Sequence, residues 1–87
     1  MPYYTYVVEC ADGSLYTGWT NDLLLRLEKH NAGLGARYTR GRRPVKLITS
    51  WMFESKSEAM SWEWHFKQLS RREKLHLLAG NQAALSP

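Results

Sequence analysis

Arg26 and His30 lie one helical turn apart inside the leucine-rich run LLLRLEKH, so a helix would bring both side chains to one edge. A later amphipathic run, EAMSWEWHFK, places Glu63 at the edge of a face formed by Trp62 and Phe66. Phosphodiester cleavage requires a proton acceptor for water, a cation beside the phosphate oxygens and a metal at the leaving oxygen. A histidine or a tyrosine can accept the proton, an arginine suits the phosphate oxygens, and a glutamate can bind the metal.

Two tyrosines, Tyr6 and Tyr16, lie in the runs YYTYVVEC and SLYTGW, which the turn sequence ADG separates. These β-branched and aromatic runs predict a β-hairpin whose loop length decides where the tyrosines point. A two-residue turn sends them to opposite faces of the sheet. A three-residue loop with Gly13 in the left-handed region places Val8 opposite Tyr16, with Tyr6 diagonally on the same face. Only the second register lets both rings join one site.

A helix is predicted from about residue 21 to residue 31, capped by Thr20 or Asn21 and stopped near Gly33. The two basic side chains would stand at the border between core and solvent. The expected buried stripe of this helix comprises Leu23, Leu24 and Leu27.

The rest of the chain predicts one strand and two further helices. A Gly- and Arg-rich loop, 32–44, leads into VKLITSWMF, a typical strand sequence. Helices are expected over about 56–69 and 71–78, with Gly80 as the stop and 81–87 as a frayed tail. Each helix begins with a capping box, and the pairs are Ser55 with Glu58 and Ser70 with Glu73.

The element order β-β-α-β-α-α predicts an α+β fold, in which helices cover a small antiparallel sheet. With 87 residues the chain can build one domain, here expected over residues 1–80. The single cysteine, Cys10, excludes an internal disulfide. Neither a signal peptide nor an apolar run long enough to cross a bilayer is present, which favours a cytoplasmic protein without membrane contact.

Positive charge is concentrated in the loop sequence ARYTRGRRPVK, within a chain whose formal net charge is +4. Such a cluster is often only a solvated surface. Here the cations are interleaved with an aromatic and a hydroxyl side chain, a mixture that suits phosphate contacts and stacking on an unpaired base. The predicted nucleic-acid-binding residues are Arg37, Tyr38, Thr39, Arg40, Arg42, Arg43 and Lys46.

The ordered set of YTY at 4–6, YTG at 16–18, Arg26, His30 and the helical Glu63 resembles the GIY-YIG nuclease domain. It is most similar to the small stand-alone bacterial members, the UPF0213-like group. The first motif departs from the family name, since Tyr4-Thr5 replaces Gly-Ile. Gly18 is the glycine of the second motif.

This resemblance implies an α/β sandwich around a three-stranded antiparallel sheet, and an endonuclease that hydrolyses DNA. It implies one Mg²⁺ or Mn²⁺ ion bound mainly by Glu63, and no organic cofactor. Arg26 would hold the scissile phosphate. Tyr6, Tyr16 and His30 would position or deprotonate the water, and the identity of the base stays open among these three.

Two other interpretations compete with the nuclease. A nucleic-acid-binding module with this fold would show little or no catalysis, and a protein-interaction domain would use exposed tryptophans. Glu63 also precedes Lys67 by one turn, the spacing of an ordinary surface ion pair. If the chain is a nuclease, so small a domain has little surface for reading a sequence. Cutting directed by DNA structure or by a recruiting partner protein is therefore expected.

Overall fold

Residues 2–85, the part of the chain that a computed structural model describes, form strands and helices in the order β-β-α-α-β-α-α, with side chains described to residue 80. The strands form one antiparallel sheet in the order β2-β1-β3. The predicted α+β fold and element order are confirmed, with α2 added inside the segment predicted as a loop. The elements are β1 (Tyr3–Glu9), β2 (Leu15–Thr20), α1 (Leu23–Asn31), α2 (Arg37–Arg40), β3 (Lys46–Phe53), α3 (Lys56–Lys67) and α4 (Arg71–Leu85).

The β1–β2 hairpin has the three-residue loop. Gly13 has a φ of 84°, and the Cys10 N–H donates to the Ser14 carbonyl at 2.8 Å. Val8 accordingly pairs with Tyr16, which leaves the side chain of Tyr6 on the same face. The register that lets the tyrosines share a site is thus the one adopted.

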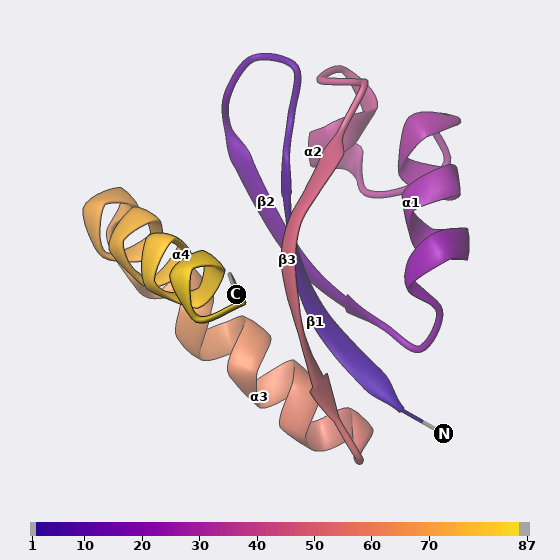
Figure 1. The fold of residues 1–87 in the computed structure, drawn as a ribbon. Helices are drawn as coiled ribbons and strands as arrows, with labels where there is room; N and C mark the ends of the chain where they lie inside the picture. Colours follow the sequence, from indigo (N-terminus) through magenta and orange to yellow (C-terminus); the bar gives the residue numbers. More distant parts are fainter. Residues whose placement is uncertain (1, 86–87) are drawn as a thin grey trace.

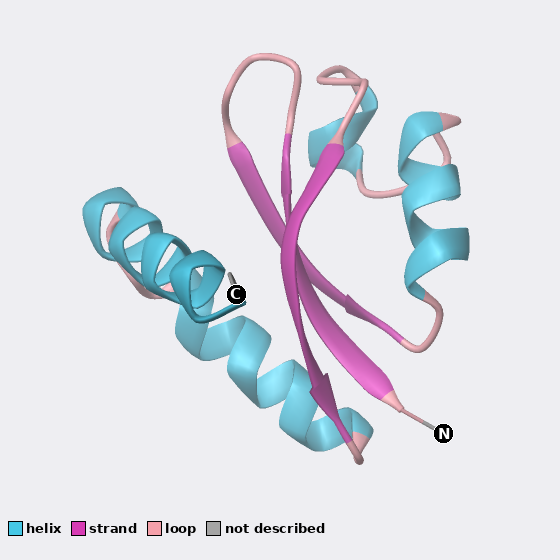
Figure 2. Ribbon diagram, viewed as in Figure 1, coloured by secondary structure: helices cyan, strands magenta, loops and turns pink. Residues whose placement is uncertain are grey.

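The sheet separates two helical layers, with α1 and α2 on one face and α3 and α4 on the other (Figure 1). Figure 2 shows the same arrangement as cyan helices on either side of magenta strands. Successive side chains of β1 point to opposite faces of the sheet, so the strand can pack against both helical layers. Tyr6 and Val8 pack against Leu23 of α1, whereas Val7 packs with Phe66 of α3.

Strand β3 carries one extra residue. Val7 pairs with Thr49 and Val8 with Leu47, so Ile48 forms a β-bulge. Ile48 packs into the α3–α4 layer, and the exposed Lys46 begins the strand. Because β3 lies at one side of the sheet, the bulge interrupts its ladder close to an open edge.

Helix α1 starts later than predicted, and its cap is neither Thr20 nor Asn21. Asp22 caps it instead, since its carboxylate accepts from the Leu25 N–H at 3.1 Å. Leu23 and Leu27 pack against the core as predicted. The prediction for Leu24 is wrong: its side chain is 76% exposed, because the helix packs on the sheet along a narrower stripe.

Both predicted capping residues of the later helices are confirmed. The Ser70–Glu73 pair is fully reciprocal, with N–H···O distances of 2.9 and 3.1 Å. At Ser55 the hydroxyl accepts from the Glu58 N–H at 3.2 Å and donates to its carboxylate at 2.9 Å.

The predicted end of α4 near Gly80 is wrong, because the helix continues to Leu85. A glycine ends a helix when it takes a positive φ, and among the described glycines only Gly13 and Gly33 do so. Of the predicted tail, residues 86–87 lie outside the described part of the chain. Over that part, none of the helices combines the length and the apolar character needed to span a bilayer.

Candidate active site

Gly18 lets the ring of Tyr6 reach across strand β2. The two residues pair directly, and a Cβ at Gly18 would lie 2.6 Å from the Tyr6 hydroxyl oxygen and 3.2 Å from the Tyr16 ring. The two tyrosine rings are tilted toward one another, with centroids 6.5 Å apart. A glycine is needed where side chains approach a strand so closely. The motif glycine thus positions both rings.

The Tyr6 hydroxyl begins a chain of buried hydrogen bonds. Its oxygen lies 2.7 Å from His30 Nε2, and His30 Nδ1 lies 2.7 Å from Thr39 Oγ1. The Thr39 hydroxyl donates to the Ala36 carbonyl at 3.0 Å, so its oxygen accepts from His30. This assigns the imidazole proton to Nδ1. In the neutral ring, Nε2 is then the acceptor for the Tyr6 hydroxyl.

Burial keeps both members of the Tyr6–His30 pair uncharged at neutral pH. Burial lowers the pKa of His30 below its ordinary 6.5, and the Arg26 guanidinium lowers it further. Burial also raises the pKa of Tyr6 above its ordinary 10.0. The predicted border position of His30 is wrong, because its side chain is fully buried beneath the loop that follows α1.

Arg26 brings positive charge to the outer end of this chain. Its side chain is half-buried, as predicted, and its Nε–H donates to the Tyr6 oxygen at 3.3 Å. That hydrogen bond is the main cause of a raised pKa of the guanidinium, and the Tyr16 hydroxyl adds to it. The Tyr16 ring lies edge-on to His30 at 5.4 Å between centroids. The arginine is therefore hydrogen-bonded to the Tyr6 hydroxyl and interacts electrostatically with both tyrosines.

Glu63 approaches the tyrosines from the other layer, on α3. Its side chain is 20% exposed and pairs with Lys67 at 3.4 Å. Lys67 Nζ lies 5.8 Å from the centroid of the Tyr16 ring. After burial and the neighbouring Tyr16, the charge of Glu63 also raises the pKa of Tyr6. The charge of Glu63 thus acts on Tyr6 from the opposite layer, and its ion-pair partner Lys67 lies beside the Tyr16 ring.

The five side chains occur in the order and the fold of a known catalytic domain. Residues 2–76 match the family model described as the GIY-YIG catalytic domain. The chain belongs to the GIY-YIG family. It is 53% identical over 79 residues to the UPF0213 protein BH0048 of Halalkalibacterium halodurans, covering 91% of this chain and 84% of that protein. It is 54% identical over 76 residues to the UPF0213 protein CPE1444 of Clostridium perfringens, covering 87% and 82%.

Two solution NMR structures of similar proteins have the same fold as this chain. The solution NMR structure of the UPF0213 protein BH0048 from Bacillus halodurans matches with a TM-score of 0.60 at 53% identity, over 91% of this chain and 84% of that one. The NMR structure of the protein EF2693 from E. faecalis matches with a TM-score of 0.61 at 38% identity, over 100% and 91%. The predicted resemblance to UPF0213-like GIY-YIG proteins is confirmed.

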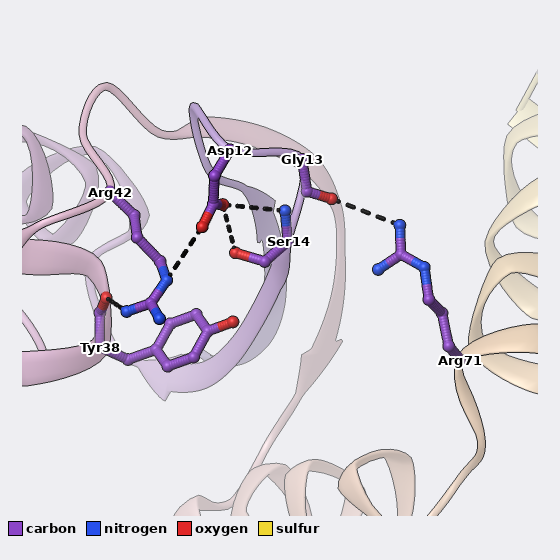
Figure 3. A network of polar contacts seen from close by, with 6 residues as sticks. All are labelled: Asp12, Gly13, Ser14, Tyr38, Arg42 and Arg71. Atoms are coloured by element: carbon purple, nitrogen blue, oxygen red, sulfur yellow. Dashed lines mark hydrogen bonds and ion pairs between the residues drawn. The ribbon is translucent and has the colours of Figure 1, made fainter.

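Two of the predicted nucleic-acid-binding arginines of this GIY-YIG domain are used inside the molecule. Arg42 donates to Asp12 at 3.1 Å and to the Tyr38 carbonyl at 2.8 Å, with its guanidinium 4.0 Å from the Tyr38 ring centroid (Figure 3). Arg43 donates to the carbonyls of Arg40 and Asn31, at the ends of the two short helices. These two arginines thus hold the basic loop, residues 36–46, against the β1–β2 hairpin and against α1.

The remaining basic side chains of the loop are more available. The exposed ones are Arg37, Arg40 and Lys46. The ring of Tyr38 is partly exposed, but it also contacts the Arg42 guanidinium and stacks on the Tyr16 ring, with 5.9 Å between the two ring centroids. The prediction that Thr39 contacts nucleic acid is wrong, because its side chain is fully buried.

Sequence reasoning missed the tasks of Thr39 and Gly35. Thr39 fixes the His30 tautomer, and a Cβ at Gly35 would lie 2.8 Å from His30 Cγ. The signal that points to them is the short spacing of a small residue and a hydroxyl residue after His30, which allows the chain to fold back onto the ring.

We expect Thr39→Val to destabilise the domain by about 1–3 kcal/mol, because it leaves the buried His30 Nδ1–H without an acceptor. Urea unfolding measures the loss, and ¹⁵N NMR of the imidazole should show a smaller Nδ1–H population. Thr39→Ser, which retains the hydroxyl, is the matched control. Equal stability and an equal Nδ1–H population in the Val and Ser variants would contradict the assigned hydrogen-bond direction.

Proposed function

We propose that the protein is a divalent-metal-dependent endonuclease that hydrolyses phosphodiester bonds in DNA. The observation that supports it best is the meeting of Arg26 and His30 at the Tyr6 hydroxyl, in a hydrogen-bond chain with one direction. Membership of the GIY-YIG nuclease family supports the same reaction class.

In this proposal the Tyr6–His30 pair removes the proton of the attacking water. Neutral His30 Nε2 takes the hydroxyl proton of Tyr6 while the phenolic oxygen takes a proton from the water. Tyr16 is half-buried, compared with 1% exposure for Tyr6, and it positions the water. Arg26 stabilises the charge on the non-bridging phosphate oxygens with the N–H groups that it does not give to Tyr6.

A metal at this site would be held by Glu63. In the described part of the chain no group of three or more ligating side chains occurs, so the protein would supply at most two ligands, of which we propose the Glu63 carboxylate as one. That fits Mg²⁺ or Mn²⁺, which commonly keep several waters and bind through one or two carboxylates plus substrate phosphates. The ion would stabilise charge on the leaving oxygen.

The ion pair of Glu63 with Lys67 favours a second function, a nucleic-acid-binding module with little catalysis. The ammonium occupies the carboxylate that a metal would need. In both functions the exposed basic residues of the loop would contact phosphates. For the nuclease, DNA structure or a recruiting protein would direct the cut, since one small domain reads little sequence.

A cleavage assay separates the two functions. We expect metal-dependent products with Mn²⁺ or Mg²⁺, and none with EDTA, on at least one of single-stranded, duplex, flapped and branched DNA. Intact DNA in every lane, together with a salt-sensitive gel shift, would favour the binding module.

The pH dependence of cleavage should report His30. The proposed acceptor works as the neutral imidazole, so kcat/KM should fall as the pH drops through the pKa of His30. Since burial lowers that pKa, the midpoint of the acid limb should lie below 6.5. A midpoint clearly above 6.5, measured under single-turnover conditions with saturating metal, would exclude His30 as the acceptor.

The two kinds of loop arginine should behave differently in DNA binding. Arg40→Ala removes an exposed cation, and we expect the slope of log K against log salt to fall by about one. Arg42→Ala should mainly lower stability, since Arg42 binds Asp12 and Tyr38. Fluorescence anisotropy over a salt series, beside thermal unfolding, measures both. An unchanged slope for Arg40→Ala would remove it from the DNA contact.

A further inference from the structure

We propose that a hollow beside Arg26 binds an unpaired nucleotide next to the scissile phosphate, so that the substrate carries a single-stranded segment at the cut. This rests on the proposed nuclease function and names its substrate class. The hollow measures about 530 Å³, within the usual range for ligand sites. Its lining residues are Tyr3, Trp19, Thr20, Asn21, Arg26 and Lys56.

Arg26 joins this hollow to the candidate active site. Its Nε–H binds the Tyr6 hydroxyl, and the same side chain lines the hollow. A phosphate held by Arg26 would therefore have its neighbouring nucleotide at the entrance. The hollow is placed by the end of β2 and the starts of β1, α1 and α3, all outside the basic loop.

Two aromatic rings form one side of the hollow. Trp19 and Tyr3 are half-buried, with centroids 6.4 Å apart and planes inclined by 49°. Aromatic side chains on β-strands often serve only the core. Here both rings line an open hollow, and stacking on a base is what such partly exposed rings offer. A base inside a duplex is already stacked on its neighbours, so the occupant is an unpaired one.

Lys56 provides a cation at the same place. Its ammonium lies 5.1 Å from the centroid of the Trp19 ring, and neither of the ion pairs among residues 2–80 includes it. A base that stacks on Trp19 would displace the flexible ammonium from the ring. The ammonium would then pair with the phosphate of the bound nucleotide.

Binding is best tested without cleavage. The probe is a fluorescein-labelled oligothymidylate in EDTA, compared with a blunt duplex of equal length. We expect Trp19→Leu to weaken single-strand binding by about fivefold or more, the range of one lost base stack, and to leave duplex binding within about twofold. Trp64→Leu is the matched control, since that tryptophan is 60% exposed and is not among the residues that line the hollow.

Two further variants keep the test decisive if Trp19→Leu fails to fold. Trp19→Phe retains a smaller ring and should lose less affinity than the leucine variant. Lys56→Gln should lower the salt slope for the single strand by about one. Equal single-strand affinity of the Trp19 and Trp64 variants, or an unchanged slope for Lys56→Gln, would overturn the proposed nucleotide site.

The same variants separate this inference from the nuclease proposal. If Trp19→Leu loses single-strand affinity but the wild type cleaves no DNA with metal, the nucleotide site is supported and the nuclease proposal is contradicted. If the wild type cleaves DNA and Trp19→Leu binds single strands with unchanged affinity, the nuclease proposal is supported and the nucleotide site is contradicted. A wild type that cuts flapped DNA faster than duplex, with the preference lost in Trp19→Leu, would support both.

Discussion

Glu63→Gln should reduce metal-dependent cleavage by about 10²–10³-fold or more, while DNA binding in EDTA stays within about twofold. The substitution keeps the shape of the side chain and removes the charge that the metal would need. Because Glu63 lies on α3, apart from the exposed basic residues of the loop, the phosphate contacts should survive. Single-turnover cleavage over a metal series, beside anisotropy measurements of binding, tests both halves of this expectation.

Glu28→Gln is a suitable control for that experiment. It removes one carboxylate from an exposed position on α1, so the change in net charge is the same. Cleavage by this variant should match the wild type. If Glu63→Gln cleaved as fast as Glu28→Gln, the carboxylate of Glu63 would have no part in the reaction. Glu63 would then serve only as the ion-pair partner of Lys67.

Gly35→Ala should be the most damaging single-methyl change for the fold near the site. The added Cβ would lie 2.9 Å from His30 Cα and 2.8 Å from His30 Cγ, so backbone and ring must both move. Overpacking of this kind costs about 1–3 kcal/mol, and sometimes more. Chemical denaturation measures the loss. Displacement of the imidazole should also lengthen its contact with Tyr6, so cleavage should fall even where the variant stays folded.

Gly41→Ala tests whether crowding or lost backbone freedom causes the effect. A Cβ at Gly41 would meet no atom within 4 Å, and its φ of −95° suits any residue. The stability of this variant should lie within about 0.5 kcal/mol of the wild type. A loss at Gly41 as large as the loss at Gly35 would show that the loop tolerates no substitution, and the crowding argument would fail.

Local signals predicted most of the framework. The ADG turn, read with the demand that both tyrosines share a face, led to the observed register of Val8 and Tyr16. The capping boxes marked the starts of α3 and α4, because a serine and a glutamate three residues later satisfy each other within one turn.

The interior of the site was harder to predict, because it depends on contacts between distant segments. A helical pattern places His30 at the edge of a leucine stripe, but its burial comes from Thr39 and Gly35 folding back over it. Likewise, composition alone cannot separate the exposed Arg40 from Arg42. The ion pair of Arg42 with Asp12 depends on how the basic loop meets the hairpin.

The bulge at Ile48 has a consequence for the protein at high concentration. An outer strand with free N–H and C=O groups can pair with a strand of another molecule, which leads to aggregation. The bulge interrupts the even spacing that such pairing needs, and the exposed Lys46 adds a charge that an incoming strand would have to bury. The side of the sheet remote from β2 is thereby protected against growth into a larger sheet, which leaves individual molecules free to diffuse.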